Sequence, residues 1–205
     1  MKIFVADGNN RIRNICTQYG IGILSSPSYF RVPPQNLNYI LDNGAFSAWK
    51  NNQPWNEELF YTIIHRLIIE EIIPYFVVIP DIVCGGLKSL EQSQIHMGRL
   101  PKHWKKYLPV QDGMTTGDID LENIDGIFVG GSVRWKWKTA REWCDFAHNH
   151  NVRCHIGRVG SIRDYIKADS CGADSVDGSG PSRNNRMDIP IKFLEIISKE
   201  QKKLF

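Results

Sequence analysis

Carboxylate and amide side chains that could do chemistry follow short apolar runs at several places in this chain. The most informative is the segment Ala173–Asn184, in which an apolar run ends in Asp177 and is followed by glycines, a proline and Arg183. Glycines at such a point let backbone or a ligand approach closely, and a proline fixes the exit of the loop. An aspartate at a strand end suits catalysis, although Asp177 before Gly178 also fits ordinary turn chemistry.

The same pattern recurs after other apolar runs, and this repetition favours function over turn formation. Polar residues and glycines are common after the runs and rare before them; the set comprises Asp42, Asp81, Gln111, Gly130, Gly131 and Asp177. Asp and Gln side chains present acceptors and donors in a plane, as the polar edge of a purine requires. Glycine N–H groups could donate to a carbonyl oxygen such as guanine O6. Two aspartates would remain for nucleophilic attack at an anomeric carbon and for proton transfer.

The elements that must position these residues alternate between strands and helices. We expect strands at Lys2–Val5, Ile21–Leu24, Tyr39–Leu41, Tyr75–Ile79, Leu108–Gln111, Gly126–Val129, Arg153–Ile156 and Ala173–Val176. We expect helices at about Asn10–Gln18, Asn56–Ile72, Ser89–Leu100, Thr139–Asn149, Ile162–Cys171 and Ile191–Lys202. The segments 25–38 and 115–123 should connect strands without a full helix. Such alternation predicts an α/β fold, a compact (β/α)8 TIM-type barrel whose C-terminal strand ends share one face.

The composition is that of one globular domain over residues 1–205, with 42% hydrophobic and 23% charged residues. A net charge of +3 is too small to indicate a nucleic-acid partner by itself, so the placement of basic residues matters more. No apolar run is long enough to span a bilayer, and the N-terminus lacks a signal-peptide profile. The five cysteines are scattered, which predicts a cytoplasmic protein without disulfides or a metal site.

Taken in order, the strand-end segments form a set of motifs: Asp42–Phe46, Pro80-Asp81, Val110-Gln111, Val129–Ser132, His155–Gly160 and Asp174–Asn184. The set resembles the motif series of the tRNA-guanine transglycosylase superfamily. Within it, the chain is most similar to the compact, zinc-less DNA 7-deazaguanine transglycosylases of phages. The resemblance runs from about Leu41 to Arg186, and it is the order of the motifs, more than any one of them, that is specific. It implies a cofactor-independent glycosyltransferase that replaces guanine in DNA with a free 7-deazaguanine base.

The resemblance also implies a role for each matching residue. Asp177 matches the nucleophile that attacks C1′ and holds the nucleic acid covalently, and Asp42 matches the general base. Asp81 and Gln111 match the pair that reads the edge of the base. The remaining matches are Gly130 and Gly131 as backbone donors to the base carbonyl, Phe46 as a stacking face beside the base, and Arg158, Arg183 and Arg186 as nucleic-acid contacts.

Departures from the family pattern bear on the substrate. The tRNA enzymes carry a zinc site of three cysteines and a histidine after the nucleophile, whereas no cysteine follows Cys171 here. The family's Asp-Ser-Gly-Gly-Phe-Gln is replaced by the sequence from Asp42 to Ser47, and Gly178 stands where the family has cysteine. These differences favour DNA over tRNA as the substrate, with RNA as a possible alternative.

A segment of alternating cations and aromatics directly follows Gly130-Gly131. It comprises Arg134, Trp135, Lys136, Trp137 and Lys138. One interpretation is a nucleic-acid grip, in which the cations neutralise phosphates and a tryptophan stacks on a base. The other is that the tryptophans pack the start of a helix while the cations stay solvated. His155, within a strand, is expected to be a hydrogen-bonded core residue rather than a ligand.

Three alternatives to base exchange in DNA stay open on the sequence. A glycosylase that removes a modified base by hydrolysis would need almost the same residues. A tRNA enzyme could obtain its missing zinc domain from a partner subunit. A barrel without catalysis could bind a purine, although the presence of both Asp42 and Asp177 argues against it. The base used, the sequence context and the oligomeric state are not predicted.

Overall fold

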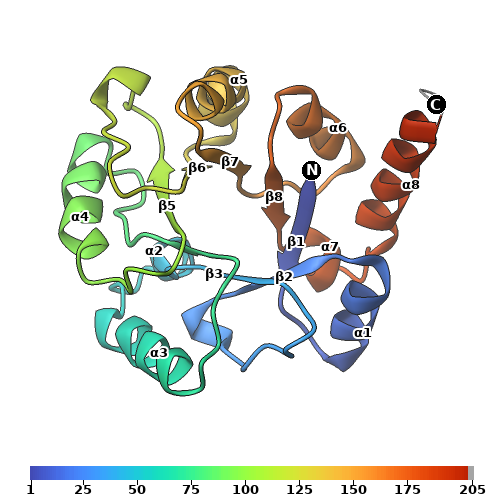
Figure 1. Cartoon of the computed structure of the whole chain (residues 1–205), viewed down its shortest axis with the longest axis horizontal. Helices are drawn as coiled ribbons and strands as arrows, with labels where there is room; N and C mark the ends of the chain where they lie inside the picture. Colours follow the sequence, from blue (N-terminus) through green and yellow to red (C-terminus); the bar gives the residue numbers. More distant parts are fainter. Residues whose placement is uncertain (203–205) are drawn as a thin grey trace.

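The computed structural model describes the backbone of residues 1–202 and the side chains of residues 1–199. Eight parallel strands close into a barrel in which each strand pairs with its neighbours in sequence and β8 pairs with β1. The helices surround the strands (Figure 1). The predicted (β/α)8 TIM-type barrel is therefore confirmed. The last residues of the predicted domain, 203–205, lie outside the described part of the chain.

All the predicted strands are present, with ends that differ from the prediction by two residues at most. They are β1 Lys2–Ala6, β2 Gly22–Ser25, β3 Tyr39–Leu41, β4 Phe76–Val78, β5 Lys106–Val110, β6 Gly126–Val129, β7 Arg153–Ile156 and β8 Ser175–Gly178. The helices are α1 Asn10–Tyr19, α2 Ala45–Lys50, α3 Glu57–Ile69, α4 Leu87–Met97, α5 Val133–Asn149, α6 Ile162–Ser170, α7 Gly180–Arg183 and α8 Asp188–Lys202. Two short 3-10 helices, η1 Pro27–Tyr29 and η2 Thr116–Asp118, occupy the segments expected to lack a full helix.

Side chains along each strand alternate between two separate hydrophobic clusters. The smaller cluster fills the barrel with Phe4, Ile40, Phe76, Val78 and Tyr107, and the rings of Phe76 and Tyr107 stack with centroids 3.7 Å apart. The larger cluster lies between the outer face of the barrel and the helices. The period of two gives Asp42 the orientation of Ile40, so the side chain that follows β3 belongs to the interior row of the barrel.

Helix α5 begins at Val133, earlier than the predicted start at Thr139. Ser132 caps it, because its hydroxyl accepts a hydrogen bond from the N–H of Trp135 at 3.3 Å. The buried residues Lys136, Ala140, Trp143, Cys144 and Ala147 recur at the spacing of one helix face. The sequence prediction was wrong here because the cations and aromatics from 134 to 138 hid an amphipathic pattern.

Two short helices were not predicted, and each begins three residues after a catalytic candidate. Helix α2 follows Asp42, and helix α7 follows Asp177. Both are only one to two turns long, so their sequences carry too few residues to show a helical period. None of the described helices has the length and apolar character that crossing a membrane requires.

Position 178, the last residue of β8, must be glycine because the backbone that follows β7 comes very close to it. A Cβ added at Gly178 would lie 1.9 Å from the carbonyl oxygen of Val159. We therefore expect Gly178→Ala to lower the free energy of unfolding by about 2–4 kcal/mol, because the backbone after β7 would have to move. Chemical denaturation measures this loss.

Gly98→Ala is the matched control, because Gly98 has an ordinary φ of −67° and no atom within 4 Å of an added Cβ. It should leave stability unchanged or raise it slightly. Equal stability of Gly178→Ala and the wild type would show that the two loops do not lie this close.

Candidate active site

Asp177 lies near the C-terminal end of β8 with 7% of its surface exposed. His155 Nε2 is 2.9 Å from Asp177 Oδ1, and the N–H of Val159 donates to the carbonyl oxygen of Asp177 at 2.6 Å. Gly157 leaves room for the carboxylate, because a Cβ there would lie 3.2 Å from Oδ1. The end of β7 therefore fixes Asp177 through both its side chain and its main chain.

Asp42 follows β3 and is held at the same end of the barrel. Its N–H donates to the carbonyl of Ser25 at 2.9 Å, and its Oδ2 accepts from the N–H of Gly44 at 3.2 Å. Burial raises the pKa of Asp42 to about 7, and the negative charges of Asp177 and Asp81 add to the effect. Charges influence one another in this way only at short range, so the three carboxylates lie close together.

Asp81 follows β4 and is braced by amide groups from two other strand ends. Asn43 Nδ2 donates to Asp81 Oδ1 at 2.8 Å and to the carbonyl of Ile79 at 2.9 Å. Gln111 Nε2 is 3.3 Å from Asp81 Oδ2. Burial raises the pKa of Asp81 to about 6, and the hydrogen bond from Asn43 opposes that rise. The two residues predicted to read a base therefore contact each other.

Gln111 is 4% exposed, and its amide nitrogen is engaged within the protein. Besides Asp81, Nε2 lies 2.9 Å from the carbonyl oxygen of Ile82 and 2.7 Å from Ser89 Oγ. The amide hydrogens of Gln111 thus hold Asp81 and the loop after β4 in place. In this structure the amide N–H groups of Gln111 are therefore used to support Asp81 and not to bind a base.

The predicted backbone donors Gly130 and Gly131 differ from each other. The N–H of Gly130 donates to the carbonyl of Val110 at 2.9 Å, so the prediction of a donor to the base is wrong for Gly130. The strand ladder simply continues one residue beyond β6. Among the described residues the N–H of Gly131 has no hydrogen-bond partner, and Gly131 has a φ of 68° that suits glycine.

Asp112 holds the turn that contains Gly131. Its Oδ2 accepts from the N–H of Ser132 at 2.5 Å, and its Oδ1 accepts from the Ser132 hydroxyl at 2.6 Å. Burial alone would raise the pKa of Asp112, but these two hydrogen bonds, together with its own backbone N–H and the charge of Arg158, lower the pKa. The carboxylate is thus committed to shaping the loop after β6.

Arg158 joins three loops at this end of the barrel. Its guanidinium lies over the ring of Phe46, 4.9 Å from the ring centroid, and its Nη2 donates to the carbonyl of Gly131. Arg158 has a φ of 57°, which is unusual for a residue with a side chain. Phe46, predicted to stack on a base, is 37% exposed and is covered on one face by this cation.

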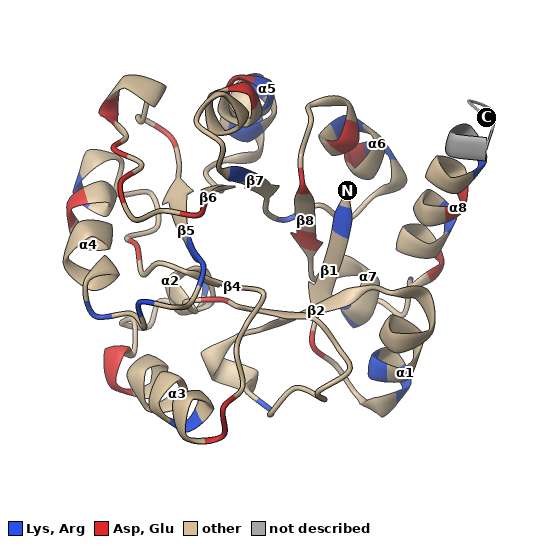
Figure 2. Ribbon diagram, in the orientation of Figure 1, with Lys and Arg blue, Asp and Glu red and all other residues tan. Residues whose placement is uncertain are grey.

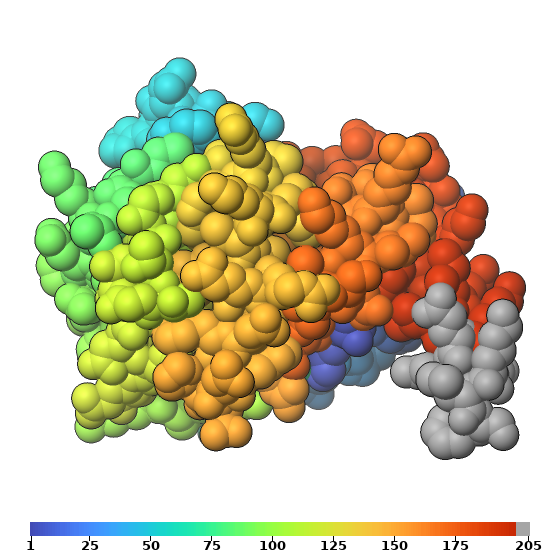
Figure 3. Space-filling view, turned by 90° about the horizontal axis from the view of Figure 1, so that it is seen from above, coloured from blue at the N-terminus to red at the C-terminus, as the bar shows by residue number. Residues whose placement is uncertain are grey.

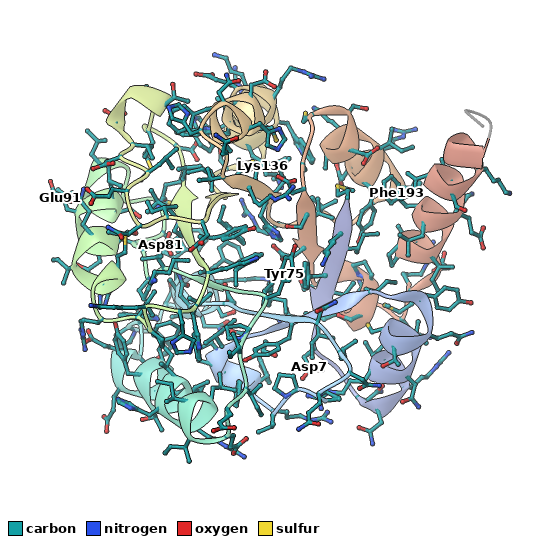
Figure 4. The ribbon with its side chains drawn as sticks, in the orientation of Figure 1. Asp7, Tyr75, Asp81, Glu91, Lys136 and Phe193 are labelled. Carbon is teal, nitrogen blue, oxygen red and sulfur yellow. The ribbon has the colours of Figure 1, made fainter. Side chains whose placement is uncertain are left out.

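Lys136 is buried, so its predicted contact with a phosphate is wrong. It is 1% exposed, and its Nζ donates to the carbonyls of Gly157 at 2.7 Å and Arg158 at 3.2 Å. Burial, with the nearby charge of Arg158, lowers the pKa of Lys136 to about 8. Figure 4 shows Lys136 on the side of α5 that faces the barrel. Because α5 begins at Val133, Lys136 falls on its inner face.

The tryptophans of the same segment pack against the protein. The ring centroids of Trp135 and Trp143 are 6.2 Å apart, and the ammonium groups of Lys136 and Lys167 each lie 4.9 Å from the ring centroid of Trp137. Both are partly buried against the main core. The packing interpretation therefore describes the tryptophans as the structure has them.

The exposed cations of the predicted set are Arg134, Lys138, Arg158, Arg183 and Arg186. Arg186 pairs with Asp188 at 2.9 Å. Lys and Arg residues also lie on α5 and α6 (Figure 2), and these helices lie side by side in the gold and orange part of Figure 3. Phosphate contacts by these exposed cations stay a prediction.

Two hollows in the structure lie away from the carboxylates. One, of about 150 Å³, lies between α4 and the segment 120–124. The other, of about 430 Å³, lies at the N-terminal ends of β3 and β4, next to Tyr39 and Tyr75. Neither contains the strand-end residues, so the candidate site rests on the clustered carboxylates and not on these hollows.

No group of three or more His, Cys, Asp or Glu side chains within the described residues is arranged to hold a metal ion.

Three residues of the site were missed by sequence reasoning. His155 was interpreted as a core histidine, which it is, but it also contacts Asp177. Asn43 and Asp112 were given no role from the sequence, and in the structure they brace Asp81 and Ser132. No sequence signal could have found the contact of His155, because it depends on the pairing of β7 with β8, in which His155 is in register with Ser175.

No protein-family model matches the chain, and no curated protein matches it.

The raised pKa of Asp42 predicts a pH-dependent effect of Asp42→Asn on stability. The unfolded chain loses this proton near pH 4, whereas the folded protein keeps it until about pH 7. The wild type therefore loses stability as pH rises through this window. Asn carries no charge, so we expect the variant to gain on the order of 2 kcal/mol relative to the wild type at about pH 8 and nothing near pH 4.

Asp118→Asn is the control with the opposite sign. Hydrogen bonds from Thr115 lower the pKa of Asp118, so its ionised form stabilises the fold above pH 4. This variant should lose stability near pH 8 and converge on the wild type in acid. Denaturant titrations over a pH series measure the difference in stability between Asp42→Asn and the wild type. If that difference does not change with pH, Asp42 is not in the enclosed, charged environment described.

Proposed function

We propose that the protein replaces a guanine base in DNA with a free 7-deazaguanine base through a covalent intermediate on Asp177. The observation that carries this proposal is that Asp42 and Asp177, from strand ends far apart in the sequence, interact electrostatically at one end of the barrel. A retaining glycosyl transfer needs two such carboxyl groups, one as the nucleophile and one as the proton carrier.

The environments of the two aspartates suit different tasks. Asp42 has a pKa of about 7, so near neutral pH it is present in both protonated and ionised forms. It can therefore protonate a departing base and deprotonate an incoming one. Asp177 is nearly buried and fixed by His155 and Val159, as a nucleophile that must meet C1′ in one orientation would be.

In the proposed reaction, a carboxylate oxygen of Asp177 forms a bond to C1′ while the bond between C1′ and the base nitrogen breaks. The electron pair of that bond leaves with the base, and Asp42 supplies its proton. The incoming base then gives a proton to Asp42 and attacks C1′, and the ester electrons return to Asp177. Bond energy is kept in the covalent intermediate, so no external energy source is needed.

Recognition of the base is assigned to groups next to these carboxylates. Asp81 would accept from, or when protonated donate to, the edge of the purine, since its pKa is about 6. The N–H of Gly131 would donate to the carbonyl of the base.

The choice of DNA rests on the resemblance of the strand-end motifs to those of the DNA-directed enzymes. An exposed set of cations, Arg134, Lys138, Arg158, Arg183 and Arg186, is available for the phosphate backbone. The chain would act on a base that is turned out of the stack, a step that takes a few kcal/mol in a duplex.

Asp177→Asn tests the nucleophile. Asn keeps an oxygen that can accept from His155 Nε2, so the variant should fold, but a neutral amide cannot form the ester. We expect incorporation of a labelled 7-deazaguanine base into DNA to fall by at least about 1000-fold. Mass spectrometry of the digested nucleosides, with tRNA in a parallel reaction, measures the product.

The control is Asp169→Asn, which changes an exposed aspartate on α6 and should incorporate base at the wild-type rate. Normal incorporation by Asp177→Asn would rule out the proposed nucleophile. Abasic sites formed without added base would favour hydrolysis, and product in tRNA alone would favour the RNA substrate.

Arg134 and Lys138 test the nucleic-acid surface. Replacing both with Ala should weaken DNA binding and make the plot of log affinity against log salt shallower by about one for each phosphate that is no longer neutralised. The control is Lys102→Ala with Lys105→Ala, which removes two exposed cations next to the N-terminal end of β5. Binding assays over a salt series should leave the slope of this control unchanged. Equal slopes for both pairs would exclude α5 from the DNA interface.

A further inference from the structure

Three polar side chains of β7 and β8 form a hydrogen-bonded chain that ends at Asp177. Ser175 Oγ lies 2.8 Å from His155 Nδ1, and His155 Nε2 lies 2.9 Å from Asp177 Oδ1. His155 is fully buried, and Ser175 is 1% exposed. Buried polar groups of this kind need partners, and here they satisfy one another.

The chain of partners determines which histidine nitrogen carries the proton. Among the described residues the only hydrogen-bond partner of Ser175 Oγ is His155 Nδ1. The buried Ser175 hydroxyl therefore donates to Nδ1, which must be an unprotonated acceptor. The proton of a neutral imidazole is then on Nε2, where it points at the carboxylate of Asp177.

Aromatic rings hold the imidazole in this orientation. The ring of Phe128 stacks on His155 with centroids 4.7 Å apart and an angle of 21° between the planes. Phe76 presents its edge at 5.1 Å, and Phe4 packs at 6.3 Å. With both ring nitrogens bonded and these neighbours in place, the imidazole cannot rotate without losing both hydrogen bonds.

We infer that His155 is a positioning residue for the nucleophile, set by Ser175 as the neutral Nε2–H tautomer, and that it holds Oδ1 of Asp177 so that Oδ2 attacks C1′. This inference rests on the proposed function. The Nε2 proton stays on His155 throughout the reaction. A donor stabilises a carboxylate more than an ester oxygen, so His155 also favours the second half-reaction, in which Asp177 leaves C1′ as a carboxylate.

Other ionisable groups also face Asp177. They are Asp42 after β3, Lys136 on α5 and Tyr165 on α6, each influenced by the charge of Asp177. The charge of Asp177 raises the pKa of Asp42 and of Tyr165 and opposes the lowering of the pKa of Lys136. The pH profile of a variant at His155 must therefore be compared with that of the wild type, since these three groups are present in both proteins.

The first test needs no activity. Nitrogen-15 NMR of histidine-labelled protein shows which ring nitrogen of His155 bears the proton, with His155→Gln identifying the signal. We expect the proton on Nε2 in the wild type and a mixture of tautomers in Ser175→Ala. A proton on Nδ1 in the wild type would overturn the inference. A proton on Nε2 in a protein that exchanges no base would leave the hydrogen-bond assignment standing and contradict the proposed function alone.

The second test measures the effect on Asp177. His155→Phe removes the donor, and we expect kcat to fall by about 10-fold to 100-fold with little change in KM for the base. The acid limb of the pH profile should move to higher pH, because the carboxylate form of Asp177 loses its hydrogen bond. The share of protein carrying the covalent adduct at steady state should rise. His155→Gln, which keeps an N–H donor, should restore part of the rate.

The chain offers a control of the same type. His148 Nε2 lies 2.9 Å from Asp174 Oδ2 at the other end of β8, so His148→Gln changes a histidine–aspartate pair outside the site. It should leave kcat and the pH profile unchanged. If His155→Phe does not fold, Ser175→Ala is measured in its place. We expect its pH profile to shift in the same direction by a smaller amount. An unchanged pH profile and adduct level in folded variants at His155 would overturn the inference.

Discussion

Repulsion between carboxylates at one end of the barrel is the constraint to which the rest of the site responds. Asp42, Asp81 and Asp177 lie close enough for the first to feel the charges of the other two. Each is then stabilised by neighbouring donors: Gly44 for Asp42, Asn43 and Gln111 for Asp81, and His155 for Asp177. Such an arrangement is unfavourable for folding alone, and clustered, perturbed ionisable groups are typical of functional sites.

The closed parallel barrel makes this arrangement possible. All the strands run in one direction, so their C-terminal ends meet, and the alternation of side chains gives each strand one row that points inward. Aromatic rings fill the interior below the carboxylates. The donors come from loops that are themselves fixed, since Asp112 holds the turn after β6 and Lys136 holds the carbonyls after β7. The site is therefore supported by buried contacts on several sides.

The fold and the strand-end carboxylates could be predicted from the sequence because both follow from local patterns. Short apolar runs followed by Asp or Gly mark the strand ends, and their number predicts the barrel. The start of α5 could not be predicted in this way, because Lys136 lies on the buried face, where a cation is rare. The partnership of His155 with Asp177 depends on strand register, which a single sequence does not contain. Gly130 was misjudged for a related reason, since its N–H is used by the ladder with Val110.

The most direct test of the account is to locate the covalent bond between protein and nucleic acid. The protein would be mixed with a DNA oligonucleotide, denatured before the second base is added, digested, and sequenced by tandem mass spectrometry. The account predicts a sugar-linked adduct on the side chain of Asp177 that disappears when 7-deazaguanine base is added before denaturation. An adduct on any other residue, or base exchange without an adduct at Asp177, would contradict it.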